Sequence, residues 1–75
     1  MPLLDRISLD SAIRFGKPCV RGTRITVGDV LRYVASGMTE AQVIADFPDL
    51  AHDDILASLA FAAERERRIM PVPAD

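Results

Sequence analysis

The sequence predicts a mainly α domain in which three short helices with tight connections follow a small N-terminal β element, the outline of a helix-turn-helix unit. Apolar residues recur at helical spacing in three segments, and capping or helix-breaking residues mark the ends of those segments. The first 26 residues instead carry Gly and Pro around short apolar stretches. At 75 residues there is room for one domain. We expect it over residues 1–69, with a flexible tail over 70–75.

Residues 6–26 are predicted to form a segment of short strands and turns. Residues 7–9 alternate apolar and polar side chains, which is typical of a strand, and we expect Cys19 and Val20 to pair with it. Residues 16–18 read Gly-Lys-Pro, which interrupts regular structure. Gly22 is free to adopt a positive φ, so that the chain can turn sharply there.

The first helix is predicted over residues 27–36. Thr26 stands at the N-cap, Asp29 follows three residues later as its partner in a capping box, and Gly37 ends the helix. Its apolar face is expected to consist of Val27, Val30, Leu31, Val34 and Ala35.

The second helix is predicted over residues 39–47. It begins in the same way, with Thr39 as the capping residue and Gln42 as its partner. Pro48 stops it after about two turns.

The third and longest helix is predicted over residues 52–68. Ala51 is a poor N-cap, so its first turn is expected to fray, although Asp53 and Asp54 favour the positive end of the helix dipole. One apolar stripe of this helix is predicted to be buried, formed by Ile55, Leu56, Leu59, Ala62 and Ala63.

Charge is divided sharply along the chain, although the net charge is only −2. Residues 1–32 carry six Lys or Arg against three acids, whereas residues 33–63 carry five acids and no Lys or Arg. A surface with two signs of charge suits a protein partner or self-association, and the alternative is an ordinary solvated surface. Folding at this size buries only about 60% of the surface of the unfolded chain, so homodimerisation would supply missing burial.

Four bases in or beside the Gly-rich segment are the candidates for DNA contacts: Arg14, Lys17, Arg21 and Arg24. Readout by the third helix is disfavoured, because Asp53 and Asp54 would enter a groove lined by phosphates. The alternative is that Arg21 and Arg24 pair with acids such as Asp29 or donate to loop carbonyls.

Two aromatic residues fall off the apolar stripes. At about 100° per residue, Phe61 lies opposite the predicted buried face of the third helix, and Tyr33 leaves the stripe of the first. We therefore expect both to point outward and, with Arg65 and Arg68, to contribute to a protein interface. The alternative for Phe61 is packing under the N-terminal segment of its own chain.

No catalytic residue, metal site or cofactor is predicted. Cys19 lies in an apolar setting, and Cys19 with His52 lacks a third orienting group. The Gly-Lys-Pro and Arg-Gly-Thr-Arg stretches lack the spacing of a phosphate-binding loop. One cysteine and the absence of a membrane-length apolar run favour a soluble, cytoplasmic protein with neither a membrane contact nor a small-molecule substrate.

The run from Phe15 to Val27, together with Gly37-Met38-Thr39 and Phe47-Pro48-Asp49-Leu50, resembles the family catalogued as domain of unknown function 433. The resemblance covers about Ile7 to Glu64. Its signature segment would consist here of Gly16, Lys17, Pro18, Arg21, Gly22, Thr23 and Arg24. The sequence departs from the family pattern at Ala51, where Thr is common.

This resemblance implies a winged or homeodomain-like trihelical fold, often dimeric, and commonly encoded beside a PIN-like nuclease as the antitoxin of a type II toxin–antitoxin pair. The expected function is therefore stoichiometric neutralisation of such a nuclease, with promoter-DNA binding for autoregulation as a further expectation. The alternatives are a sequence-specific DNA regulator and an orphan dimeric interaction module.

Overall fold

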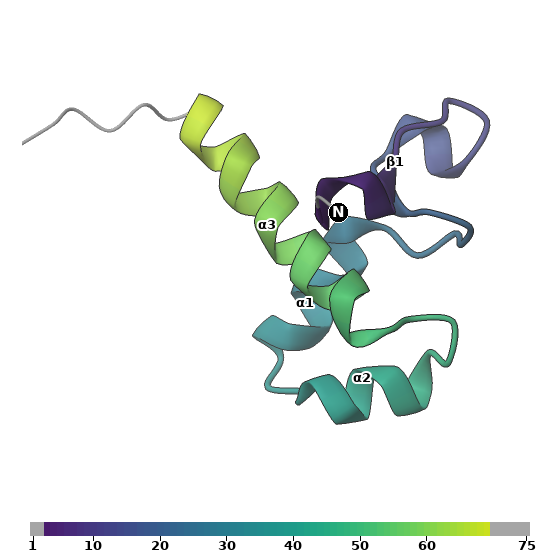
Figure 1. Cartoon of the computed structure of the whole chain (residues 1–75), viewed down its shortest axis with the longest axis vertical. Coiled ribbons are helices and arrows are strands. Elements are labelled where there is room, and N and C mark those ends of the chain that lie inside the picture. The colour runs from purple at the N-terminus through teal and green to yellow at the C-terminus, as the bar shows by residue number, and fades with distance from the viewer. Residues whose placement is uncertain (1–2, 70–75) are drawn as a thin grey trace, which may run out of the picture.

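The computed structural model describes residues 3–69, with side chains through Arg67, and it consists mainly of three helices after a short antiparallel hairpin (Figure 1). The predicted mainly α, trihelical fold with an N-terminal β element is thus confirmed. The elements in chain order are η1 (Leu3–Arg6), β1 (Ile7–Ser8), η2 (Arg14–Gly16), β2 (Cys19–Val20), α1 (Val27–Ala35), α2 (Glu40–Asp46) and α3 (His52–Ile69), where η denotes a 3₁₀ turn.

The helices all begin and end within one residue of the predicted positions, and α2 starts at Glu40, directly after its Thr39 cap. The tail predicted over residues 70–75 lies outside the described residues. Within the described part of the chain, no helix is both long and apolar enough to cross a bilayer.

The N-terminal hairpin pairs the residues that the sequence indicated. Ile7 lies opposite Val20 and Ser8 lies opposite Cys19 in antiparallel register. A further bridge joins Cys19 to Thr26, the residue that caps α1. The hairpin therefore fixes where α1 starts, because the strand and the cap share one hydrogen-bonded unit.

Both predicted capping boxes are present. The Thr26 hydroxyl accepts from the Asp29 amide at 2.9 Å, and the Asp29 carboxylate accepts from the Thr26 amide at 3.1 Å. Thr39 and Gln42 do the same for α2, at 3.1 and 2.8 Å. These reciprocal bonds satisfy amides that a helix N-terminus otherwise leaves without partners.

The start of α3 is better held than the sequence indicated. The Asp54 carboxylate accepts a hydrogen bond from the Ala51 amide at 2.8 Å, so it caps the helix from inside the first turn. Arg6 of η1 donates to the same carboxylate at 3.0 Å. The expectation that α3 frays at Ala51 overlooked this bond, which lies outside the usual N-cap position.

The core lies where α1, α3 and the hairpin meet. Its buried apolar residues come from every element except the two 3₁₀ turns and also from the loop before α3: Ile7, Val20, Val27, Val30, Val43, Leu50, Ile55 and Ala57. Figure 1 shows α3 running across α1, with η1 beside it on the other side. α3 is thus covered from two directions.

The buried face of α3 differs from the predicted stripe. Ile55 is buried as expected, but Asp54, Ala57 and Ser58 are buried as well, whereas Leu59 is 40% exposed. Ala63 is exposed too. The prediction failed because η1 and its Arg6 cover the side that carries Asp54, and because the Ser58 hydroxyl donates to the Asp54 carbonyl inside the helix at 2.9 Å.

Candidate functional site

A half-open cleft of about 470 Å³ lies between the Lys17-Pro18 segment, the first turns of α1 and the C-terminal half of α3. Four cationic side chains line it: Arg14, Lys17, Arg32 and Arg65. Its one acidic residue is Asp29, and its apolar wall includes Val27, Leu31 and Phe61. We call this site the cationic cleft. It brings together bases from three separate parts of the chain.

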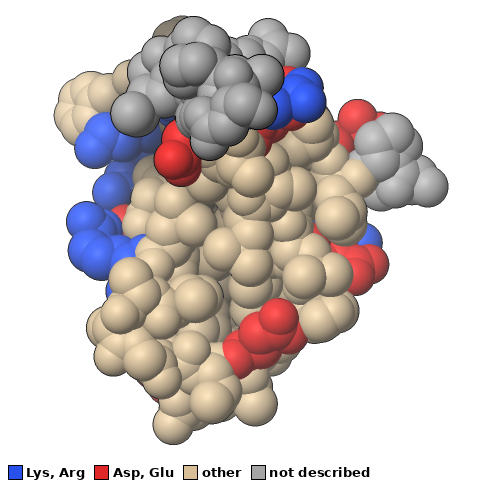
Figure 2. All heavy atoms as spheres, turned by 90° about the vertical axis from the view of Figure 1, so that its left-hand side faces the viewer, with Lys and Arg blue, Asp and Glu red and all other residues tan. Residues whose placement is uncertain are grey.

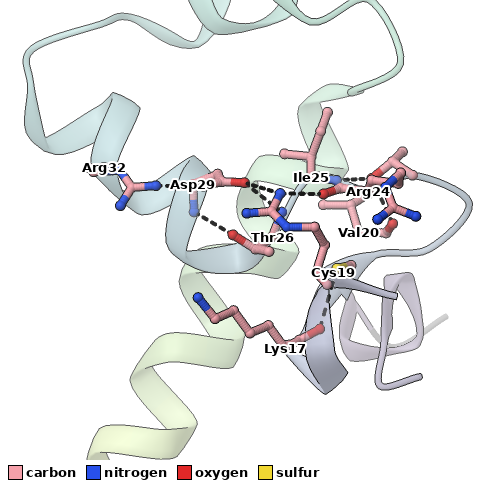
Figure 3. Close-up of polar contacts among 10 residues, drawn as sticks. Lys17, Cys19, Val20, Arg24, Ile25, Thr26, Asp29 and Arg32 are labelled. Atoms are coloured by element: carbon pink, nitrogen blue, oxygen red, sulfur yellow. Dashed lines mark hydrogen bonds and ion pairs between the residues drawn. The ribbon is translucent and has the colours of Figure 1, made fainter. Parts of the chain in front are cut away.

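Asp29 organises one side of the cationic cleft. Besides capping α1, its carboxylate accepts from Arg32 at 2.6 Å and from Arg14 at 3.3 Å (Figure 3). Arg14 also donates to the Arg24 carbonyl at 3.0 Å. Two guanidinium groups are therefore held in place by one carboxylate, and the cleft keeps an excess of positive charge.

The pKa of Asp29 lies below its ordinary value of 3.8. Burial raises the pKa of this carboxyl group. The hydrogen bonds with the backbone and side chain of Thr26 and the positive charges of Arg14 and Arg32 lower it by more. In the folded chain the ionised carboxylate is therefore favoured.

The lowered pKa of Asp29 predicts a loss of stability in acid. The stabilisation is complete above the unfolded pKa and disappears as the pH falls through the lower folded pKa. Between about pH 4 and pH 2, the native chain should lose more free energy of unfolding than Asp29→Asn, which keeps an oxygen for the cap. Urea unfolding of both proteins across this range measures the difference, and parallel curves would contradict the assignment.

The four candidates for DNA contacts divide into two pairs. The guanidinium of Arg21 donates to the carbonyls of Asp5 at 2.8 Å and Ile7 at 3.3 Å, so it ties η1 to the hairpin. Arg14 is engaged with Asp29 and the Arg24 carbonyl. Within the described residues, the exposed side chains of Lys17 and Arg24 make no hydrogen bond or ion pair. The alternative of carbonyl bonding is confirmed for Arg21 and is wrong for Arg24.

The acidic residues at the start of α3 have different surroundings. Asp54 is buried and paired with Arg6, whereas Asp53 is exposed and lies 3.5 Å from the same guanidinium. Of these two acids, Asp53 is therefore the one whose free carboxylate oxygen would repel the phosphates of a DNA groove.

The aromatic candidates lie further inside than predicted. The ring of Tyr33 stacks on Phe47 with centroids 4.7 Å apart, and the residue packs against the core. The expectation that Tyr33 points outward is wrong, because Phe47, after α2, lies against α1. Phe61 is half-buried, and the Arg65 guanidinium lies 5.9 Å from its ring centre. The side chain of Arg68 lies outside the described ones.

Phe61 also lines a second cleft, with Leu4, Ile7 and Leu9 from the N-terminal segment. It therefore stands between an apolar cleft and the cationic cleft. This is close to the alternative in which Phe61 packs under its own N-terminal segment.

Sequence reasoning missed the most exposed aromatic residue. Phe15 is 97% exposed and has a φ of 59°, between Arg14 at 50° and Gly16 at 80°. Left-handed backbone at two consecutive residues other than glycine is energetically costly. The available signal was its place directly before Gly16-Lys17-Pro18, which interrupts regular structure.

Cys19 and His52 have separate roles. Cys19 is buried in the hairpin, and its thiol donates to the Lys17 carbonyl at 3.3 Å. His52 is exposed at the start of α3, with its Nδ1 at 2.5 Å from a Glu40 carboxylate oxygen. Among the described residues, no three His, Cys, Asp or Glu side chains come together in a group suited to a metal ion.

Comparison with known proteins bears on the fold and the family. The sequence profile of the family described as "Protein of unknown function (DUF433)" matches residues 7–62. The structure is similar to the crystal structure of a DUF433 member protein from Anabaena variabilis ATCC 29413, with a TM-score of 0.77 and 23% sequence identity. The similarity covers 85% of this chain and 63% of the Anabaena chain.

No curated protein matches the sequence. The profile match extends over most of the chain and includes the whole Gly-Lys-Pro to Arg-Gly-Thr-Arg segment, so this protein belongs to the DUF433 family.

Proposed function

We propose that the domain is the antitoxin-like member of a type II toxin–antitoxin pair, which neutralises a PIN-like nuclease by stoichiometric binding. The observation that supports this proposal best is an apolar stripe on the outward side of α3. Its members are Leu56, Leu59, Ala60 and Ala63.

The stripe follows from the geometry of α3. At about 100° per residue, Leu56, Ala60 and Ala63 lie opposite the side that carries Asp54 and Ser58. Leucine and alanine at such positions leave apolar surface in water, which in a small monomer is typical of a binding surface. Figure 2 shows a broad, largely uncharged face with Lys and Arg gathered along its left edge and with Asp or Glu on its lower part and at its right margin.

Charge favours an acidic partner for this surface. Arg67 extends from α3 near the end of the stripe. Its side chain is largely exposed, and its guanidinium lies 3.3 Å from a Glu64 carboxylate oxygen. Nucleases that depend on Mg²⁺ or Mn²⁺ present clustered carboxylates, which complement arginine at the rim of an apolar contact. The proposal therefore joins an apolar surface to an exposed arginine at its end.

Co-expression with the product of the adjacent open reading frame tests the proposal. Leu59→Asp places a charge on the exposed leucine of the stripe and should weaken co-purification at least about tenfold. Ala45→Asp adds the same charge at an exposed position of α2 and should leave co-purification intact. Undiminished capture by Leu59→Asp, with an unchanged melting temperature, would refute the proposal.

One other outcome of this experiment, and a separate gel-shift experiment, would support the alternatives. If Leu59→Asp lowers the mass of a homodimer in solution and no nuclease gene is adjacent, the domain is a dimeric interaction module. The exposed side chains of Lys17 and Arg24, which make no hydrogen bond or ion pair with the described residues, favour promoter binding as a second candidate function. A salt-dependent gel shift with the promoter of its own operon would support autoregulation.

A further inference from the structure

We propose that the cationic cleft binds a phosphate monoester carried on a ring-containing body, as in a mononucleotide that is free or at the end of a nucleic-acid strand. This inference does not depend on the proposed function. It concerns the side of α3 that carries Arg65. At about 100° per residue, Arg65 lies on the opposite side of the helix from Leu56.

The charge in the cationic cleft favours a dianion. Four cationic side chains face one carboxylate, and Asp29 is already shared between Arg14 and Arg32. Within the described residues, neither Lys17 nor Arg65 has a carboxylate partner. A phosphate monoester carries a charge of about −1.5 to −2 near neutral pH, so it balances more of this excess than one carboxylate does.

The shape of the cleft favours an ester over inorganic phosphate. Its volume of about 470 Å³ is in the range of small-ligand sites, and far exceeds what a phosphate ion fills. Val27, Leu31 and Phe61 form an apolar wall, and the Arg65 guanidinium lies 5.9 Å from the Phe61 ring centre. Planar rings pack well against aromatic and guanidinium groups of this kind.

The cationic cleft is partly prearranged. Asp29 fixes Arg14 and Arg32 at 3.3 and 2.6 Å before any ligand is present, so less side-chain freedom remains to be lost on binding. Lys17 is exposed, and the rotatable bonds of a lysine side chain allow its ammonium group to approach a bound phosphate.

Gly28 keeps one side of the cleft open without being required by the fold. A Cβ atom at Gly28 would meet only the Thr26 hydroxyl oxygen, at an ordinary contact distance of 3.7 Å. A larger residue in this helical position should therefore be tolerated, and its helix propensity is better than that of glycine. Substitution at Gly28 can thus fill the cleft without changing its charge.

NMR titration of the isotopically labelled full chain tests the inference, with AMP as the probe. AMP should shift the signals of Lys17, Gly28, Phe61 and Arg65 in a saturable manner. Adenosine and inorganic phosphate should each bind at least about tenfold more weakly. A short strand with a 5′-phosphate, compared with the same strand without it, distinguishes a strand end from a free nucleotide as the source.

Three variants and one control separate the site from general attraction of anions. Lys17→Gln and Arg65→Gln should each weaken AMP binding about tenfold, and Gly28→Leu should abolish it. Arg24→Gln removes an exposed cation outside the cleft and should have no effect. An equal loss in Arg24→Gln, undiminished binding by Gly28→Leu, or AMP binding no tighter than inorganic phosphate would overturn the inference. Equally tight binding of a glutamate-containing peptide would overturn the preference for phosphate.

Discussion

Replacing Asp54 with alanine is expected to lower the free energy of unfolding by about 2–4 kcal/mol. The change removes the acceptor for the Ala51 amide at 2.8 Å and the partner of Arg6 at 3.0 Å. The Asp54 side chain is only 10% exposed, so water does not replace these contacts without cost. A domain of this size has about 5–15 kcal/mol in total, so the loss is severe.

Thermal unfolding followed by circular dichroism measures this effect. The melting temperature of Asp54→Ala should fall by about 10–25 °C. Asp54→Asn keeps an oxygen for the helix cap but loses the charge, so it should fall between the alanine variant and the native chain. This intermediate value separates the contribution of the cap from that of the ion pair.

Asp53→Ala is the matched control, because both carboxylates approach the same guanidinium. Asp53 lies 3.5 Å from Arg6 with its side chain 52% exposed, and an exposed pair of this kind contributes less than about 1 kcal/mol. Equal losses in the two variants would show that burial of Asp54 does not matter.

Features that depend on nearby residues could be predicted from the sequence. Both capping boxes join residues three positions apart, so the chain alone contains the whole interaction. The pairing of Ile7 with Val20 was also predictable, because a turn-rich segment separates two short apolar runs. These local signals were sufficient for the fold class and the element order.

Contacts between elements that are far apart in the sequence could not be predicted in this way. Arg6 and Asp54 are 48 residues apart, and no periodicity connects them. The stacking of Tyr33 on Phe47 likewise depends on how α1 meets the end of α2. The sequence pattern therefore predicted an exposed Tyr33, because a helical wheel treats α1 alone and does not include Phe47.

The candidate site shows the same limit. Arg14 and Lys17 were predicted as candidates for DNA contacts, and Arg65 was placed with Phe61 in a candidate protein interface. These three cationic residues and Arg32 line one cleft only because α3 packs against α1 in the folded chain. A count of charges along the chain showed a basic N-terminal half, but the bases of the cleft come from both halves.

Ile55→Ala is expected to destabilise the domain by about 2–5 kcal/mol, whereas Leu59→Ala should cost less than about 1 kcal/mol. The sequence pattern assigned both residues to one buried stripe. In the structure Ile55 is fully buried in the core and Leu59 is 40% exposed. Truncating Ile55 leaves a cavity among packed side chains, while truncating Leu59 mostly removes apolar surface that water already reaches.

Urea unfolding of the two variants tests the orientation of α3 directly. Both changes shorten a large aliphatic side chain to alanine within one turn of the same helix, so their effects on helix propensity are small and similar in kind. A large loss for Leu59→Ala alone would mean that α3 is rotated about its axis, so that the outward stripe with Leu59 is buried in the core. A large loss for Ile55→Ala alone would mean that the outward stripe with Leu59 is available to a partner. Leu59→Asp is then an informative change in the binding experiment, because it alters the surface and not the core.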